Sequence, residues 1–585
     1  TISSDGIASA DWWKTLGADG AQTATEPGNP DISYGEFQQG ALWRIDNKTR
    51  ETVFIQPQAR EGDPYERFNW DAPILVSPHN PKRLYFASQR VWKSENRGDG
   101  WNPISKDLTL NQERMTFPYY DKSQSWDNAW DVGAMSNYNT ITSLAESPKQ
   151  EGLIYAGTDD GLIQVTADGG ANWRKFNLND VKGLPSTPFV NDVRADLFDA
   201  NTVYAALDNH KYGDYKPYII KSTDKGRTWS LINGDLPNKI LIWRLVQDHI
   251  DKNLIFAGTE FGVYFTNNGG KNWIELESGM PTIPVRDITI QRRENDLVAG
   301  TFGRGIFILD DITPIRNFNN TVANSEATLF PIKDVNWYRQ SSRVGSQGDA
   351  EWIAKNPPFG ANFTYYLADK FKSEKDLRIE KEKNGDLKFP GWDALEEESR
   401  QDGPSVLLII NDSKGNVVNT INGSNKKGFN RVNWGLNYPN KSGERLEAPR
   451  GRGGFRGGGV MVTPGTYTVT LIKRVDGVNT VLQEPESFKV VPLYDGSLPR
   501  KSFEEMDSFR EAAFAFQQDL TATNIALSTS LKKVDAMLRA LDKATAPSDG
   551  LFKRLNETKI ALLDIDKELH GDEIKGEIGE RSNPT

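Results

Sequence analysis

The sequence predicts a mainly β protein, with a β-propeller at residues 1–320, an immunoglobulin-like (Ig-like) β-sandwich at 321–497 and an α-helical hairpin at 498–585. Three observations predict this organisation. Strand-and-turn units recur through the first half of the chain, further short strands with polar turns follow them, and the last part carries apolar residues at helical spacing. A chain of 585 residues is also too long for a single core.

The propeller prediction rests on a turn with the pattern Ser/Thr-x-Asp/Asn-x-Gly-x-x-Trp. A short apolar strand, a turn and a second strand precede each copy, and two further regions, residues 17–45 and 285–309, repeat this lead-in without the turn. About six units of four strands are therefore expected, which is typical of a propeller. The four copies of the turn run from Ser94 to Trp101, Thr166 to Trp173, Ser222 to Trp229 and Thr266 to Trp273.

The side chains of this turn have a structural explanation. Hydroxyl, amide and carboxylate oxygens accept hydrogen bonds from turn amides, glycine takes a positive φ, and the tryptophan ring fills the space between sheets. We therefore interpret Asn96, Asp168, Asp224 and Asn268 as turn caps and not as catalytic residues. Turns of this kind define a fold without reporting an activity.

Three segments resemble the bacterial BNR or Asp-box repeat proteins, which are often labelled glycosyl hydrolases and share a propeller type with sortilin (the VPS10 domain) and the xyloglucanases. The segments begin at Asp63 (DPYERFNWDAPILVSPHNPKRLYFASQRVWKSENRGDGW), Tyr204 (YAALDNHKYGDYKPYIIKSTDKGRTW) and Gly300 (GTFGRGIFILDDITPI). The resemblance covers most of residues 10–315. It implies a larger propeller, so that this chain would be the later part of a longer protein and its first blade would be incomplete.

The same resemblance bears on catalysis. Xyloglucanase-like enzymes place a catalytic Asp in a blade turn reading Thr-Asp-Ile-Gly-Gly, and the nearest counterpart here, GEFQQGALWR, has Gln38 at that position. A glutamine amide is neither a proton donor of the required kind nor a carboxylate base, so the activity does not carry over to this turn. The weak catalytic candidates are Asp159 in GTDDG, Glu260 in GTEFG and Asp131. The alternative interpretation of Asp159 and Glu260 is a solvated turn carboxylate.

Other residues point to binding. His210 and Tyr212 lie in an aromatic and charged insertion, DNHKYGDYKPY, and insertions between blade strands project from one propeller face. Gln38, Asp160 and Arg304 complete the set of predicted binding residues. A sortilin-like receptor is not expected, because such proteins carry a Cys-rich module and this chain has no cysteine.

Composition changes after Pro314, and a charged helical insertion is expected at 371–400. The arginine- and glycine-rich segment from Pro449 to Gly459 resembles an RGG nucleic-acid motif, but we interpret it as a hairpin loop because it separates two strands of an acidic protein. The six strands expected in the sandwich are Ala361–Leu367, Ser405–Ile410, Asn416–Ile421, Phe429–Leu436, Gly465–Lys473 and Glu486–Val491.

The C-terminal part predicts two helices. Ser502 and Glu505 match a capping box, and apolar residues then recur at steps of three and four until a break at Ala546–Gly550. A second apolar stripe follows, which predicts a helical hairpin. Its stripe would pack on the sandwich, within the hairpin or on another chain.

Composition disfavours several classes of function. The net charge of −10 argues against nucleic acid and anionic membrane as main partners, and no apolar run is long enough to cross a bilayer. The absence of cysteine excludes disulfides, thiolate metal sites and a cysteine nucleophile. The four histidines are widely spread, with no His-x-x-x-His pair, so no metal site is expected. No P-loop motif is present, and no cofactor is expected.

Two main functional hypotheses follow. The first is a non-enzymatic binding or scaffold protein of a Gram-negative cell envelope, either secreted, periplasmic or outer-membrane-associated, which presents a propeller face to a protein or glycan. The second is a glycoside hydrolase that acts on polysaccharide through the carboxylates named above. A peptide-binding or protease-associated role is a third possibility, and the sequence leaves the ligand, the membrane attachment and the oligomeric state open.

Overall fold

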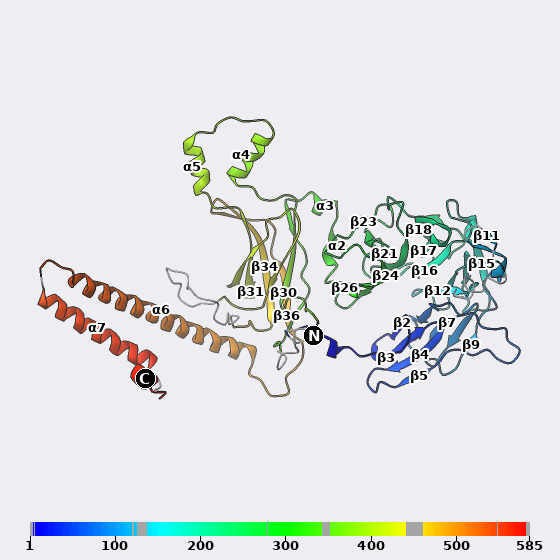
Figure 1. Ribbon diagram of the computed structural model, residues 1–585, viewed down its shortest axis with the longest axis horizontal. Helices are drawn as coiled ribbons and strands as arrows, with labels where there is room; N and C mark the ends of the chain where they lie inside the picture. Colours follow the sequence, from blue (N-terminus) through cyan, green and yellow to red (C-terminus); the bar gives the residue numbers. More distant parts are fainter. Residues whose placement is uncertain are drawn as a thin grey trace. The chain divides into compact units, whose positions relative to one another are not determined.

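The computed structural model describes residues 4, 6–119, 122–123, 125, 137–277, 279–341, 352–439, 460–546 and 548–580. The chain divides into two compact units, which are described separately. One comprises Ala8–Asn317, and the other comprises Phe318–Thr585 together with Thr1–Ile7 (Figure 1).

The first unit contains six antiparallel sheets in chain order, five with four strands and the last with three, and a short two-stranded sheet of β10 (Pro118–Tyr119) and β11 (Lys122–Ser123) between the second and third of them. In every sheet, strands that are consecutive in the chain are neighbours. The strands are β2–β5 (Gly20–Glu26, Asn29–Phe37, Ala41–Asp46, Thr52–Phe54), β6–β9 (Ile74–Val76, Leu84–Ala87, Val91–Ser94, Asn102–Pro103), β12–β15 (Ile141–Glu146, Ile154–Thr158, Leu162–Thr166, Arg174–Asn177), β16–β19 (Phe189–Ala195, Val203–Asn209, Asp214–Ser222, Ser230–Leu231), β20–β23 (Ile242–Gln247, Ile255–Thr259, Gly262–Thr266, Ile274–Glu275) and β24–β26 (Val285–Gln291, Asp296–Thr301, Ile306–Leu309).

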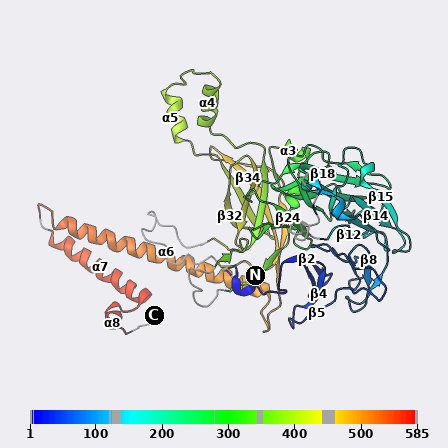
Figure 2. The same cartoon turned by 45° about the vertical axis from the view of Figure 1, so that its right-hand side comes forward.

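The six sheets are arranged radially. The first strand of each sheet packs against the first strand of the next, from β2 through β6, β12, β16 and β20 to β24 (Figures 1 and 2). Successive sheets therefore surround a common centre, which confirms the predicted propeller. One expectation is wrong: the first sheet, expected to be incomplete, has all four strands, because Thr52–Phe54 supplies a short outer strand that the sequence pattern did not reveal.

Small residues in the second strands allow this close packing. Gly157 in β13 faces β16, where an added Cβ would lie 2.3 Å from the side chain of Val190. Gly258 in β21 faces β24, where a Cβ would lie 2.8 Å from the carbonyl oxygen of Val285. The Ala-Gly-Thr ends of these strands are thus explained by the approach of the next sheet.

The four repeated turns make the hydrogen bonds expected from their sequence. In each turn the Ser or Thr hydroxyl accepts a bond from the glycine amide at 2.8–3.0 Å. Three of the four tryptophans also donate their indole N–H to a carbonyl of the preceding sheet or of the segment directly after it. Trp101 donates to Ile55, Trp173 to Ile104 and Trp273 to Ile232, at 2.7–3.1 Å. The turns therefore join neighbouring sheets as well as closing hairpins.

The second unit contains a β-sandwich. One sheet has the order β27–β30–β33, and the other has the order β28–β36–β34–β31–β32 with β35 beside β34. All six predicted strands are present, and three short ones were not predicted. The strands are β27 (Ala327–Leu329), β28 (Val335–Trp337), β30 (Ala361–Leu367), β31 (Ser405–Asp412), β32 (Val417–Gly423), β33 (Gly428–Trp434), β34 (Gly465–Val475), β35 (Val478–Val481) and β36 (Glu486–Pro492).

The inward side chains of the two sheets form one core that includes Phe363, Trp434 and Phe488. Between β30 and β31 lies the expected charged insertion, folded as α4 (Glu374–Lys383) and α5 (Trp392–Arg400). The arginine- and glycine-rich segment, Pro449 to Gly459, lies outside the described residues.

The C-terminal part forms the predicted hairpin of α6 (Phe503–Leu541) and α7 (Asp549–His570), followed by α8 (Glu573–Glu577). The capping box at Ser502 is present, since Ser502 and Glu505 exchange backbone-to-side-chain bonds. The start of α6 packs on the sandwich, where Asp507 accepts a bond from Thr463 at 2.8 Å. Among the described helices, none has the length and apolarity needed to cross a bilayer.

Candidate functional site: one face of the propeller

The meander of each sheet gives the propeller two different faces. The four tryptophan turns, between third and fourth strands, lie at one end of the sheets. The turns between second and third strands lie at the opposite end, together with the segments that lead to the next sheet, such as residues 55–73 and 104–117. We call this second end the linker face. The predicted residues Gln38, Asp159, Glu260 and Arg304 all belong to turns of the linker face.

Exposed aromatic side chains are concentrated on the linker face. Among the described residues of the first unit, only Phe198 is an exposed aromatic residue at the opposite end, while Trp12 and Phe54 lie at the N-terminal segment and an outer strand. An aromatic side chain that remains in water at a turn has not been recruited to a core, so this distribution makes the linker face the candidate binding surface. The linker face carries Tyr65, Trp70, Tyr212, Tyr215, Phe261 and Phe302, which are between 41% and 74% exposed.

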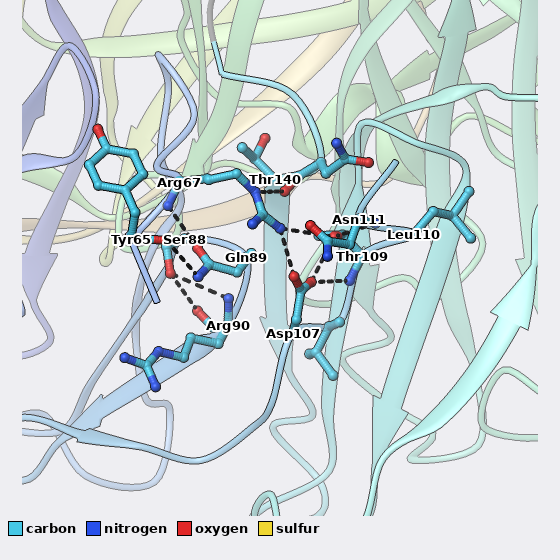
Figure 3. A network of polar contacts seen from close by, with 12 residues as sticks. Tyr65, Arg67, Ser88, Gln89, Arg90, Asp107, Thr109, Leu110, Asn111 and Thr140 are labelled. Atoms are coloured by element: carbon cyan, nitrogen blue, oxygen red, sulfur yellow. Dashed lines mark hydrogen bonds and ion pairs between the residues drawn. The ribbon is translucent and has the colours of Figure 1, made fainter. Parts of the chain in front are cut away.

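A polar network fixes the linkers between the first three sheets (Figure 3). The guanidinium of Arg67 donates to Asp107 at 2.7 Å and to the carbonyl of Asn139 at 3.2 Å. The side chain of Gln89 accepts from the Arg67 amide at 2.7 Å and donates to the Tyr65 carbonyl at 3.1 Å. Because Gln89 holds the backbone on both sides of residue 66, the exposed ring of Tyr65 is carried by a fixed segment.

Four β-bulges lie at equivalent positions around the centre of the propeller. The register shifts between the first and second strands of the third to sixth sheets, and one extra residue is left in each first strand. These bulge residues are Thr142, Asn191, Trp243 and Arg286. A bulge re-aims the side chain that it carries and is frequent beside functional sites.

The bulge residues connect successive sheets. Thr142 donates to the carbonyl of Val190 at 2.7 Å, and Asn191 donates to the carbonyl of Ile242 at 2.8 Å. In the last pair a ring contact replaces the hydrogen bond, because the Arg286 guanidinium lies 3.7 Å from the centre of the Trp243 ring. Throughout the described part of the chain, no hydrogen bond or ion pair involves that guanidinium, so its N–H groups are available to a ligand.

Trp243 is held by two further neighbours. Its indole N–H donates to Glu260 at 3.0 Å, and the imidazole of His210 meets its ring edge-on at 5.7 Å. Nδ1 of His210 lies 2.5 Å from the buried carboxylate of Asp208, which leaves Nε2 as the outer edge of the imidazole. This central cluster of Trp243, Arg286, Glu260, His210 and Asp208 joins the last three sheets.

The central cluster contains both signs of charge. Desolvation lowers the pKa of Arg286, while the carboxylates of Asp71, Glu260 and Asp208 act in the opposite direction. Asp71 is exposed and lies in the linker before β6, so the first linker and the last sheet contribute to the same cluster. Donors and carboxylate acceptors close to an aromatic ring suit a polar ligand with a flat apolar side.

The candidate carboxylates differ in their access to solvent. Asp159 is only 6% exposed, and both of its oxygens accept bonds from Thr140, at 2.9 Å from the amide and 2.7 Å from the hydroxyl. Burial raises its pKa to about 7, and the charge of Asp160 adds to the effect. Asp160 is also buried, and accepts from Thr158 at 2.5 Å and from the Leu110 amide at 2.7 Å. The alternative of a solvated turn carboxylate is wrong for Asp159, whose oxygens fix the turn.

The remaining predicted residues have separate positions. Gln38 is half-buried and donates to Asp19 at 2.8 Å. Tyr212 is 62% exposed beside His210, and Arg304 is exposed in the turn of the last sheet. Asp131 lies outside the described residues. In the described part of the chain, no group of three or more acidic, histidine or cysteine side chains is placed to hold a metal ion.

Sequence reasoning missed Trp243, Arg286, Asp208 and Asp71. A signal existed for the first two, since each is the second residue of the first strand of its sheet, directly after the linker. Alignment of the repeated units on their first strands would have placed them beside each other. Asp71 had no comparable signal, because linker lengths differ between units.

Comparison with known proteins gives one sequence relative. No known family profile matches the chain. A segment of 165 residues is 29% identical to a xyloglucanase of Hypocrea jecorina, over 26% of this chain and 19% of that enzyme. The chain thus spans about a fifth of the length of the curated relative that it matches.

The fold has relatives among solved structures. The GH74 xyloglucanase from Xanthomonas campestris is 18% identical, with 51% of this chain and 45% of that chain covered and a TM-score of 0.35. The Niastella koreensis GH74 enzyme is 14% identical over 79% of this chain and 65% of that chain, with a TM-score of 0.35. The extracellular domain of a hybrid two-component system from B. thetaiotaomicron is 10% identical over 82% and 50%, with a TM-score of 0.36. At these TM-scores the structural likenesses add no argument about activity.

Proposed function

We propose that this chain is a glycan-binding propeller protein that acts outside the cytoplasm, with the linker face as its binding surface. The observation that carries the proposal is the presence of six exposed aromatic residues at one end of the sheets and one at the other. Pyranose rings have a flat apolar side that stacks on aromatic rings, and their hydroxyl groups pair with charged and amide side chains. The linker face offers both kinds of group.

The central cluster supports the same ligand class. The guanidinium of Arg286 presents donors, and Asp71 and Glu260 present acceptors, so a neutral polyol can satisfy both without a net charge of its own. A polyanion would be repelled by the carboxylates of Asp71 and Glu260, and a polycation would be repelled by the guanidinium of Arg286. The BNR or Asp-box and sortilin-like character, and a place in a bacterial envelope assembly, remain parts of this proposal. A protein partner is the alternative occupant of the face.

Binding can be tested with soluble polysaccharides, including xyloglucan, by affinity electrophoresis and calorimetry. The triple variant Tyr65→Ser, Phe261→Ser, Phe302→Ser should weaken binding at least tenfold, because stacking contributes on the order of 1 kcal/mol for each ring. The matched control is Phe54→Ser with Phe198→Ser, which removes exposed rings away from the linker face. Equal losses in both variants, or no binding of any polysaccharide, would refute the proposal and favour a protein partner.

Glycoside hydrolysis is a second candidate, favoured by the segment similar to a xyloglucanase. Such a reaction needs one carboxyl group to protonate the leaving oxygen and a second carboxylate to act as base or nucleophile. Asp159 has both oxygens engaged, whereas Asp71 is exposed and Glu260 has one oxygen held by Trp243. We therefore place the catalytic pair, if the chain is an enzyme, at Asp71 and Glu260.

The two candidates give different results in a reducing-end assay. Release of reducing ends by the wild type, with loss in both Asp71→Asn and Glu260→Gln and retention in Asp159→Asn, would establish hydrolysis. Binding without release would leave the glycan-binding function alone. Asp71→Asn and Glu260→Gln should then change affinity but not the fold, as thermal unfolding would show.

A further inference from the structure

A second site lies in the other compact unit. A pocket of about 370 Å³ in the β-sandwich is lined by Trp337, Tyr338, Arg339, Met461 and Tyr494. Small-molecule sites commonly have this size and an aromatic lining with a few polar groups. None of the residues that line this pocket lies in a strand or turn of the linker face.

Hydrogen bonds fix the walls of this pocket. Trp337 ends β28, and its carbonyl accepts from the Leu493 amide at 3.0 Å, which sets the position of the following Tyr494. The indole N–H of Trp337 donates to the Val462 carbonyl at 2.7 Å, next to Met461. The ring of Tyr338 packs edge-on against Phe359 at 5.0 Å. The aromatic walls are therefore held by contacts that do not fill the pocket.

The polar groups that line the pocket differ in charge. Arg339 is the one charged residue among the five that line it. Within the described part of the chain, no hydrogen bond or ion pair engages its guanidinium, and it is exposed. A different pocket, beside α4, contains Lys370, Lys372 and Lys473, but these are paired with Asp376, Glu380 and Glu326 at 2.6–3.0 Å. Of the cations in these two pockets, Arg339 is therefore the one free to pair with an anionic ligand.

We propose that this pocket binds a ring-shaped ligand that carries one carboxylate, specifically a uronic acid residue of a glycan. The sugar ring would stack on the side chains of Trp337, Tyr338 and Tyr494, and its carboxylate would pair with the guanidinium of Arg339. Guanidinium and carboxylate groups match in a planar, two-point geometry that a neutral sugar cannot reproduce. The inference goes beyond the proposed function, because it assigns an acidic sugar to a separate site in the other compact unit, whereas the linker face is proposed to bind a neutral glycan.

The test uses the whole chain with trigalacturonate, cellotriose as the neutral analogue and 4-hydroxycinnamate as an aromatic acid. Saturation-transfer NMR and calorimetry should show trigalacturonate binding at least tenfold more tightly than cellotriose at this site. Arg339→Gln and Tyr494→Ala should each weaken it at least tenfold, since both residues are exposed and their loss should leave thermal unfolding unchanged. Arg500→Gln is the control, because Arg500 is paired with Asp495 at 3.8 Å and does not line the pocket.

Each result has a defined meaning. Equal affinity for the two trisaccharides that survives Arg339→Gln would overturn the carboxylate site while leaving glycan binding at the linker face intact. Failure of both acids to bind would overturn the pocket itself. Binding of 4-hydroxycinnamate without trigalacturonate would keep the ring-and-carboxylate chemistry and overturn the glycan as its source. The aromatic triple variant of the linker face should retain trigalacturonate binding, so the two proposals fail separately.

Discussion

Glu36 allows a sharp test of the propeller's electrostatics. Its carboxylate, 1% exposed on β3, accepts bonds from the amides of Gly40 at 3.0 Å, Ala72 at 3.3 Å and Gln22 at 3.4 Å. Burial raises its pKa from 4.5 to about 8, although the amide donors lower it in part and Asp71 raises it further. The folded protein therefore holds this proton in a pH range in which the unfolded chain releases it.

The sign of the effect follows from linkage. A raised pKa in the folded state gives a contribution to stability that is fully present below pH 4.5 and is lost as the pH rises to about 8. One pKa unit corresponds to about 1.4 kcal/mol, so ionisation in the unfolded chain lowers the free energy of unfolding by about 3 kcal/mol between pH 5 and pH 8. Glu36→Gln stays neutral throughout, and it preserves the two bonds to Oε1 when its amide oxygen takes that position.

The assay is urea unfolding of the wild type and Glu36→Gln at several pH values, followed by tryptophan fluorescence. The difference between the two proteins should grow in favour of the variant by about 3 kcal/mol from pH 5 to pH 8. Glu61→Gln, at an exposed position, is the control and should show no such growth. A difference between wild type and Glu36→Gln that stays constant with pH would refute the buried, protonated state of Glu36.

Three further predictions follow from the same propeller. Trp173→Phe should destabilise it by about 1 kcal/mol more than Trp229→Phe in denaturant unfolding, because Trp173 donates to Ile104 whereas the buried indole N–H of Trp229 has no partner among the described residues; equal losses would contradict the role of the turns in joining sheets. Asp159→Asn should gain stability relative to wild type at pH 8 but not at pH 4, since its pKa is raised to about 7 by burial, and it should leave polysaccharide affinity unchanged. Arg316→Gln should lower the free energy of unfolding by about 3–5 kcal/mol, because Arg316 forms a two-point ion pair with the fully buried Asp248, and a loss below 1 kcal/mol in thermal unfolding would be inconsistent with that burial.

Local patterns predicted most of the fold. The four tryptophan turns identify their hairpins because hydroxyl, glycine and indole groups each satisfy a requirement of the turn itself. The long sandwich strands and the capping box at Ser502 are likewise local features. The short strands β5, β27, β28 and β35 were missed, because three or four residues hold too little alternation to be read and are strands only through their neighbours.

The site was predictable only in its outer part. Glu260 and His210 stand in turns that the repeat pattern places on one face. Trp243 and Arg286 are separated by 43 positions and meet only because adjacent sheets pack through their first strands. The bulges that direct these two side chains depend on pairing register, which a single strand does not encode.

The bulge residues also bear on the binding function that we propose for the centre. In the third and fourth sheets, Thr142 and Asn191 each donate a hydrogen bond to the next sheet. In the fifth and sixth sheets, Trp243 and Arg286 occupy the same positions, and the Arg286 donors remain unused in the described structure. The position therefore joins sheets in all four cases, and in the sixth sheet it also leaves N–H donors that the binding proposal assigns to a ligand. Catalysis would in addition require a carboxyl group that exchanges a proton with substrate. Asp159, whose pKa is raised to about 7 by burial, is enclosed by Thr140, which leaves Asp71 and Glu260 for that role. A ligand held by Trp243 and Arg286 needs no such group, so the binding proposal predicts that Arg286→Gln loses affinity while the wild type releases no reducing ends, and release of reducing ends by the wild type would favour hydrolysis instead.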